Sequence, residues 1–252
     1  MFRYAVTAAV LCGAVTIALH GQGRGGGAAP SPRAAAPIDL TGTWVPLITE
    51  DWRWRMRVPP KGDYASVPLN AAGVKMVESW DPAQDAAAGE QCRGYGAPAV
   101  MRLPGQVRIS WDGDTVMKVE TEAGSQTRLF AFGAQPQQQP QPPGWQGTSA
   151  AFWQPAGGGG GRRGGGGPAR GGSLRVVTTN LKPGYLRRNG VPYSANARLT
   201  EYYNRANEAN GDAFLVVTTL VEDPTYLNTR WVTSTHFKKV PDGGPWTPGP
   251  CE

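Results

Sequence analysis

The block Ser173–Lys239 decides the fold, because it contains Leu174-Arg-Val-Val-Thr-Thr-Asn-Leu181 and Ala213-Phe-Leu-Val-Val-Thr-Thr-Leu-Val-Glu222. Both stretches are rich in β-branched residues, which suit a pleated and half-buried surface. Two further stretches, Ala197–Asn204 and Trp231–Lys238, have the same character. The block therefore predicts four β-strands.

A second set of strand patterns precedes this block. Apolar and polar residues alternate over Val107–Trp111, and the Asp112-Gly113 pair that follows is typical of a hairpin turn into Thr115–Thr121. Ala123-Gly124 predicts another turn into Gln126–Phe132. We expect these three strands to form the other half of the same sheet, with a short aromatic strand at 145–153 between the halves.

These patterns predict an all-β fold in which an antiparallel meander of about eight to ten strands curls into a barrel or half-barrel. Closure would protect the many strand edges that such a sheet presents. A β-sandwich is the alternative. One or two short helices are expected at one end, at Leu69–Trp80 with Asn70 as the cap, and after Asp81-Pro82.

The N-terminus has the features of an export signal. Arg3 precedes an apolar run of about 16 residues, shorter than the roughly 20 that a membrane-spanning helix needs. We therefore expect residues 1–23 to be a signal peptide, the mature protein to be periplasmic or secreted, and no stable membrane span to remain after cleavage. Residues 24–38 would be a linker, 39–240 one β-rich domain with low-complexity loops at 133–144 and 155–172, and 241–252 a Pro/Gly-rich tail.

Composition limits the chemistry. In an oxidising compartment the two mature cysteines, Cys92 and Cys251, are expected to form a disulfide; two unpaired thiols are the alternative. With His236 as the single mature histidine, no closed metal site can be built, and no motif indicates a cofactor. The net charge of +6, from 25 basic against 19 acidic residues, does not indicate a nucleic-acid partner. Composition leaves the oligomeric state open.

Arginine and tryptophan alternate in Glu50-Asp-Trp-Arg-Trp-Arg-Met-Arg57. In a strand, Trp52 and Trp54 would lie on one face, and Arg53 and Arg55 on the other. Such a strand could be an ordinary edge with a solvated outer face. It could also be an anion or sugar site, since guanidinium groups bind anions and aromatic rings stack.

The connection Tyr185–Tyr193 is the best candidate binding loop. It combines Arg187, Arg188 and Tyr193 between two strands, where loops on a rigid scaffold commonly carry function. An ordinary turn at its Asn-Gly pair is the alternative. Glu201 is a further candidate, as a ligand contact or as an acid–base carboxylate, and Glu222 is the alternative carboxylate.

The chain resembles a group of exported, β-rich bacterial proteins without an assigned activity. The segments that carry the resemblance are Gln91–Met101, Trp145–Ser149, Trp153, Leu199–Glu201 and Val221–Tyr226. It departs at Gly147–Thr148, where the group has a histidine. Separately, Gly42-Thr-Trp44 resembles the first strand of lipocalin-like (calycin) barrels, which implies a Trp at the closed end under an arginine such as Arg230.

Three functions remain open. The chain could be a non-enzymatic binding protein that holds a small amphipathic or anionic ligand in a barrel mouth, lined by Trp52, Trp54, Arg187, Arg188 and Tyr193. It could be a hydrolase or isomerase that uses a cleft carboxylate. It could also be an envelope interaction module that acts through its low-complexity loops.

Overall fold

The structure is a computed structural model that describes residues 29–133, 142–156, 171–242 and 244–252. The predicted signal peptide and most of both low-complexity loops lie outside these residues. The first half of the chain forms β1 (Gly42–Leu47), α1 (Trp52–Arg55), α2 (Ala71–Ser79), α3 (Pro82–Ala87), η1 (Gln91–Tyr95), α4 (Ala97–Val100), β2 (Val107–Asp112), β3 (Val116–Thr121), η2 (Ala123–Ser125) and β4 (Gln126–Phe132). The second half forms β5 (Thr148–Pro155), β6 (Gly172–Thr179), β7 (Gly184–Arg187), β8 (Val191–Tyr193), β9 (Arg198–Asn207), β10 (Ala213–Glu222) and β11 (Trp231–Val240).

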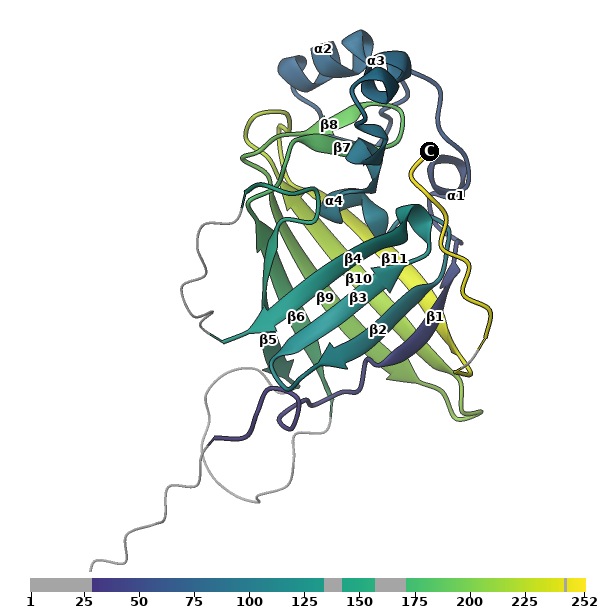
Figure 1. Cartoon of the computed structure of the whole chain (residues 1–252), viewed down its shortest axis with the longest axis vertical. Helices are drawn as coiled ribbons and strands as arrows, with labels where there is room; N and C mark the ends of the chain where they lie inside the picture. Colours follow the sequence, from purple (N-terminus) through teal and green to yellow (C-terminus); the bar gives the residue numbers. More distant parts are fainter. Residues whose placement is uncertain (1–28, 134–141, 157–170, 243) are drawn as a thin grey trace, which may run out of the picture.

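Nine strands close into a barrel in the order β1-β11-β10-β9-β6-β5-β4-β3-β2 (Figure 1). Closure depends on β1, whose residues Gly42–Trp44 pair with β2 while Thr43–Leu47 pair with β11. The predicted all-β barrel is confirmed, and neither the half-barrel nor the β-sandwich is found. Pro46 is accommodated in β1 because that strand has only one neighbour beyond Trp44.

One pairing departs from a simple antiparallel meander. β4 and β5 run parallel, with Phe130 opposite Ser149 and Phe132 opposite Ala151. In sequence, the first low-complexity loop therefore falls between parallel neighbours, whereas the second falls between the antiparallel neighbours β5 and β6.

The barrel interior is filled by large side chains. Trp44, Phe130, Tyr203 and Phe237 are fully buried, and the Trp44 indole donates a hydrogen bond of 2.9 Å to the Leu40 carbonyl. The expected arginine above Trp44 is absent, because β1 and β11 are antiparallel and place Lys239 opposite Trp44. Arg230 precedes β11 at the other end of the barrel and is exposed.

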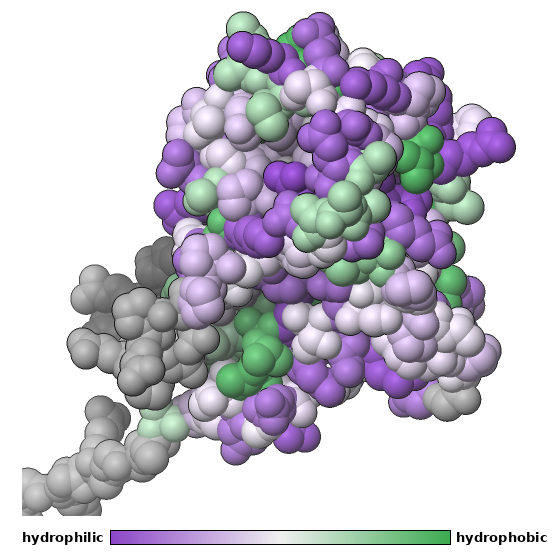
Figure 2. Space-filling view, turned by 45° about the horizontal axis from the view of Figure 1, so that its top comes forward, coloured by the Kyte–Doolittle hydropathy of each residue, from purple (hydrophilic) through white to green (hydrophobic). Residues whose placement is uncertain are grey.

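Helices and a small hairpin cover one opening of the barrel (Figure 1). The cap consists of α2, α3, η1, α4 and the β7–β8 pair. Both predicted helix starts are confirmed: the Asn70 side chain accepts from the Gly73 amide at 2.9 Å, and the Asp81 side chain accepts from the Ala83 amide at 2.9 Å. In the view with the cap brought forward, its surface is mostly hydrophilic with small hydrophobic patches between (Figure 2).

The strand predicted at Trp52–Arg57 is wrong. Asp51 adopts a left-handed conformation with φ 52°, and its carbonyl accepts from the Arg55 amide at 3.1 Å, which starts the single turn α1. The turn leaves Trp52 63% exposed and Arg55 1% exposed, so the predicted faces are not formed.

The C-terminal tail returns along the barrel to the cap. The predicted disulfide is confirmed, since Cys92 and Cys251 are bonded with their Cα atoms 5.1 Å apart. Glu122 holds the tail, because its side chain accepts from the Thr247 amide at 2.7 Å and its carbonyl from the Gly249 amide at 2.9 Å. The last residue, Glu252, is thereby fixed against the cap.

Candidate functional site

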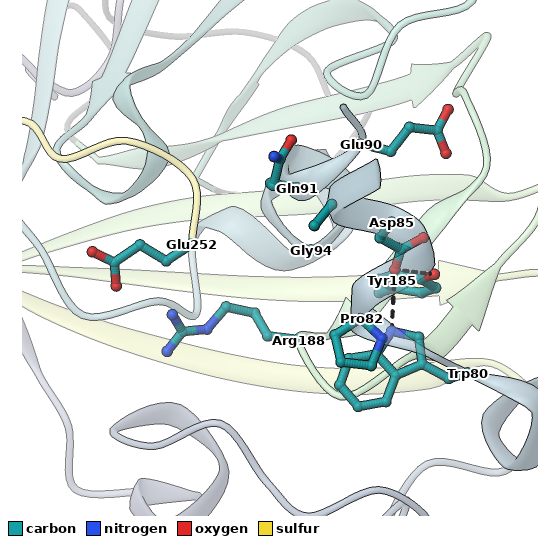
Figure 3. A pocket seen from close by; sticks show the side chains of 10 residues that line it. Trp80, Pro82, Asp85, Glu90, Gln91, Gly94, Tyr185, Arg188 and Glu252 are labelled. Carbon is teal, nitrogen blue, oxygen red and sulfur yellow. Dashed lines mark hydrogen bonds between the residues drawn. The ribbon is translucent and has the colours of Figure 1, made fainter. Parts of the chain in front are cut away.

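A pocket of about 150 Å³ lies within the cap (Figure 3). We call it the cap pocket. It is lined by residues of the α2–α3 turn, α3, η1, the β7–β8 hairpin and the C-terminus: Trp80, Pro82, Asp85, Ala86, Glu90, Gln91, Gly94, Tyr185, Arg188 and Glu252. Residues distant in sequence therefore share one pocket, and the disulfide keeps the chain end in it.

Asp85 organises one wall of the cap pocket. Its carboxylate accepts from the Tyr185 hydroxyl at 2.7 Å, from the Trp80 indole at 3.2 Å and from Arg93 at 2.7 Å. Burial and the hydrogen bond to Asp85 raise the pKa of Tyr185, so its phenol stays protonated. This wall is a fixed aromatic surface with its polar groups already bonded to each other (Figure 3).

Arg188 forms the opposite side of the cap pocket. It is half-buried, and its Nη1 donates to the Tyr95 hydroxyl at 3.2 Å. Among the residues that the structure describes, no carboxylate forms an ion pair with it. A second depression of about 350 Å³, lined by Leu103, Glu122 and Thr247 among others, shares Arg188 and Glu252 with the cap pocket. The Arg188 guanidinium therefore lies where two hollows meet.

Two glycines permit this arrangement. Gly190 has φ +82° in the turn after Arg188, and a Cβ there would lie 2.1 Å from the Trp80 ring. A Cβ on Gly94 would lie 3.0 Å from the Arg188 side chain. Larger residues would push away Trp80 or Arg188, which are the two sides of the pocket.

A second set of cationic side chains lies at the barrel mouth beneath the cap. Arg55, Arg102 and Arg187, which we call the arginine cluster, are 1%, 4% and 4% exposed. The Cζ atoms of Arg102 and Arg187 lie 5.2 Å and 5.9 Å from the centre of the Trp231 ring, and Arg187 also lies 4.7 Å from the Trp54 ring. Stacking on aromatic faces is favourable for guanidinium groups.

Glu201 lies deep inside the barrel. Its two oxygens accept from Arg128 at 2.9 Å and 2.5 Å, and the Tyr203 hydroxyl donates to it at 3.2 Å. Neither Arg128 nor Glu201 is exposed, so Glu201 is not a cleft carboxylate. Despite its burial, Arg128 has a raised pKa because Glu201 stabilises its charge. Glu222, the other candidate acid, is exposed at the end of β10.

The structure separates the residues that the sequence grouped together. Arg53, Trp54 and Arg187 meet at the mouth, where the Arg53 Cζ lies 5.0 Å from the Trp54 ring. Trp52 points to solvent, and Arg188 belongs to the cap pocket. Tyr193 is 1% exposed and packs where glycines at 96 and 184 leave room for its hydroxyl. Tyr193 therefore supports the hairpin and reaches neither site.

Sequence reasoning missed Trp80, Asp85, Arg102, Arg128 and Trp231. Trp80 caps the end of α2 and Asp85 lies within α3, where the helix pattern explained the segment without a site. Arg128 and Trp231 lie on regular strands, and alternation shows only that a residue points inward, not what it meets across the barrel. A buried arginine on an inward face is the one signal that could have identified Arg128.

Three further observations bear on the site. Within the described part of the chain, no helix is long and apolar enough to cross a membrane. Over the same residues, no group of three His, Cys, Asp or Glu side chains could hold a metal ion. Comparison with family models, with curated proteins and with solved structures gives no match.

Proposed function

We propose that the chain is an exported binding protein whose cap pocket holds a small amphipathic anion. The observation that carries the proposal is the half-buried guanidinium of Arg188, which has one hydrogen bond, to Tyr95, and no ion-pair partner among the described residues. A guanidinium group has five N–H donors, so most of those of Arg188 are free for a ligand. A carboxylate, sulfonate or phosphate group would accept from them.

The other side of the cap pocket suits the apolar part of such a ligand. The Trp80 and Tyr185 rings meet edge to face with centres 6.5 Å apart, and Pro82 lies beside them. Their polar atoms are bonded to Asp85, so this wall offers aromatic and aliphatic surface, while Glu90, Gln91 and Glu252 line other parts of the pocket. One charged end and one apolar wall are what an amphipathic anion requires.

A fluorescent amphipathic anion, anilinonaphthalene sulfonate, tests the proposal directly. We expect saturable binding to the wild type, displaced by octanoate and not by octanol, because Arg188 recognises the charge. Arg188→Met should weaken binding by about 10- to 100-fold, since a hydrogen bond to a charged group contributes about 1.5–3 kcal/mol.

The control is Arg57→Met, which removes an exposed arginine after α1 that does not line the pocket. It should bind like the wild type. Equal weakening by both substitutions, or equal displacement by octanol and octanoate, would contradict a role for Arg188 as the anion contact.

A further inference from the structure

The arginine cluster at the barrel mouth is separate from the cap pocket. Arg55 comes from α1, Arg102 follows α4, and Arg187 ends β7. The three are linked by direct contact, since Arg55 Nε donates to the Arg102 carbonyl at 2.9 Å and both Arg102 and Arg187 lie over Trp231. None of the pockets described above contains them.

The charges within the cluster do not balance. Arg55 pairs with Glu50, and Arg102 pairs with Asp51 at 2.7 Å. Among the described residues, Arg187 donates only to neutral oxygens, those of Ala65 at 2.8 Å and Ser66 at 3.0 Å. Three positive charges therefore face two negative ones, which leaves one positive charge uncompensated. The nearby Arg53–Asp63 pair is neutral in itself.

Several donors in this region also lack an acceptor among the described residues. They are Arg55 Nη2, Arg102 Nη1, and both Nε and Nη1 of Arg187, together with the Thr233 hydroxyl on β11. Buried polar groups are nearly always hydrogen-bonded, because an unmade bond costs the desolvation of the group. A buried and unpaired charge costs more than a neutral group.

We propose that the arginine cluster binds a small oxyanion, which accepts hydrogen bonds from these guanidinium groups and balances the excess charge. The oxygens of an oxyanion accept several hydrogen bonds at once, which matches guanidinium groups that can only donate. A water molecule could accept some of these hydrogen bonds, but it could not balance the positive charge. Because the cluster lies outside the described pockets, the occupant is an inorganic ion such as sulfate or phosphate, or a small carboxylate.

The pKa values of these side chains agree with this view. Burial lowers the pKa of Arg187 to about 10, and repulsion from Arg102 adds to the effect. Burial likewise lowers the pKa of Arg55 to about 10, although Glu50 opposes the shift. An anion between the guanidinium groups would favour their charged forms.

Thermal unfolding and calorimetric titration of the full mature protein test the site. Sodium sulfate, phosphate and acetate are compared with sodium chloride at equal ionic strength. We expect a saturable rise in melting temperature with at least one oxyanion. The salt that produces the rise shows whether the site prefers an inorganic anion or a carboxylate. The Arg187→Met variant should bind that ion about 10- to 100-fold more weakly. A rise that is the same in chloride, or unchanged in the variant, would overturn the proposal.

Arg188→Met is the matched control, because the neighbouring residue lies in the cap pocket instead. The Arg188→Met variant should still bind the oxyanion but bind anilinonaphthalene sulfonate weakly, and Arg187→Met should show the reverse. The two proposed sites can therefore be refuted independently. If Arg187→Met does not fold, a crystal of the wild type grown in selenate tests whether an oxyanion occupies the site. An anomalous peak within hydrogen-bond distance of Arg187 supports the site, and ordered water alone at that position overturns it.

Discussion

Arg128 and Arg187 are both buried arginines, and their surroundings are opposite. Arg128 lies within the barrel, where Glu201 binds it through two oxygens and Thr178 accepts a further bond at 3.3 Å. Within the described chain, Arg187 at the mouth has no carboxylate partner and two unbonded nitrogens, whereas Arg128 has a bound carboxylate and leaves its Nε unbonded. Inside the barrel, the charge of Arg128 is neutralised by Glu201. At the mouth, the guanidinium N–H groups of Arg187 are left to bind the proposed oxyanion.

The same contrast extends to the regions around these residues. The barrel is a continuous ladder of backbone hydrogen bonds, closed on itself by β1. The cap packs on the end of the barrel through a separate apolar cluster that joins Val77 and Tyr193 to Leu199 and Trp231. The disulfide, the bonds of Glu122 to the tail and the side chain of Asn189 add specific links. Substitutions should therefore destabilise the whole molecule when made in the barrel, and mainly loosen the cap when made there.

The largest expected effect comes from Glu201→Gln. It keeps the shape of the side chain but leaves the Arg128 charge buried and unpaired, which costs about 3–5 kcal/mol. Urea unfolding should show this loss in free energy of unfolding, with Glu222→Gln, at an exposed site on the next strand, changing little. Replacing the pair together, as Arg128→Met with Glu201→Leu, should recover most of the loss. A loss below about 1 kcal/mol for Glu201→Gln would show that the pair contributes little beyond its packing.

The next effect is loss of the disulfide. Cys92→Ser with Cys251→Ser frees a tail linked across 159 residues, and removal of a native disulfide typically costs about 2–5 kcal/mol. We expect amide exchange to increase first in η1 and in the tail after Val240, while β9 and β10 stay protected. Reduced wild-type protein is the control and should behave alike. Uniform loss of protection through the barrel would contradict the division between barrel and cap.

The barrel was largely predictable from sequence, and the cap was not. Strand patterns such as 213–222 predict their element because four of the five inward residues are apolar, Thr219 being the exception, and the strand has a neighbour on both sides. The Arg-Trp alternation after Asp51 resembles those patterns, yet it forms a helical turn that starts at the left-handed Asp51. The candidate site was found only in part: Arg188 could be named from its polar connection, but Trp80 and Asp85 meet it through packing that no local pattern records.

A smaller effect is expected from Asn189→Ala. The buried Asn189 amide donates to the Pro60 carbonyl at 2.8 Å and the Asp63 carbonyl at 3.0 Å, which ties the β7–β8 hairpin to the segment after α1. Its removal leaves two carbonyl groups without that donor and should cost about 1–3 kcal/mol in free energy of unfolding. Asn204→Ala, on the exposed side of β9, is the control. If both variants unfold alike in urea, the hairpin is held by its apolar contacts alone.

The smallest effect concerns pH at the edge of the arginine cluster. The hydrogen bond from Arg53, at 2.6 Å, and a second from the Trp54 indole hold the pKa of Asp63 below its usual value. Since the folded-state pKa lies below the unfolded one, of about 3.9, this contribution is present above pH 4 and is lost as pH falls through the folded value. Arg53 is 62% exposed, so the contribution should not exceed about 1 kcal/mol. The urea midpoints of the wild type and of Asp63→Asn should therefore differ at pH 6 and converge toward pH 2.5. Failure to converge would mean that Asp63 acts through the backbone turn at 60–65 rather than through its charge.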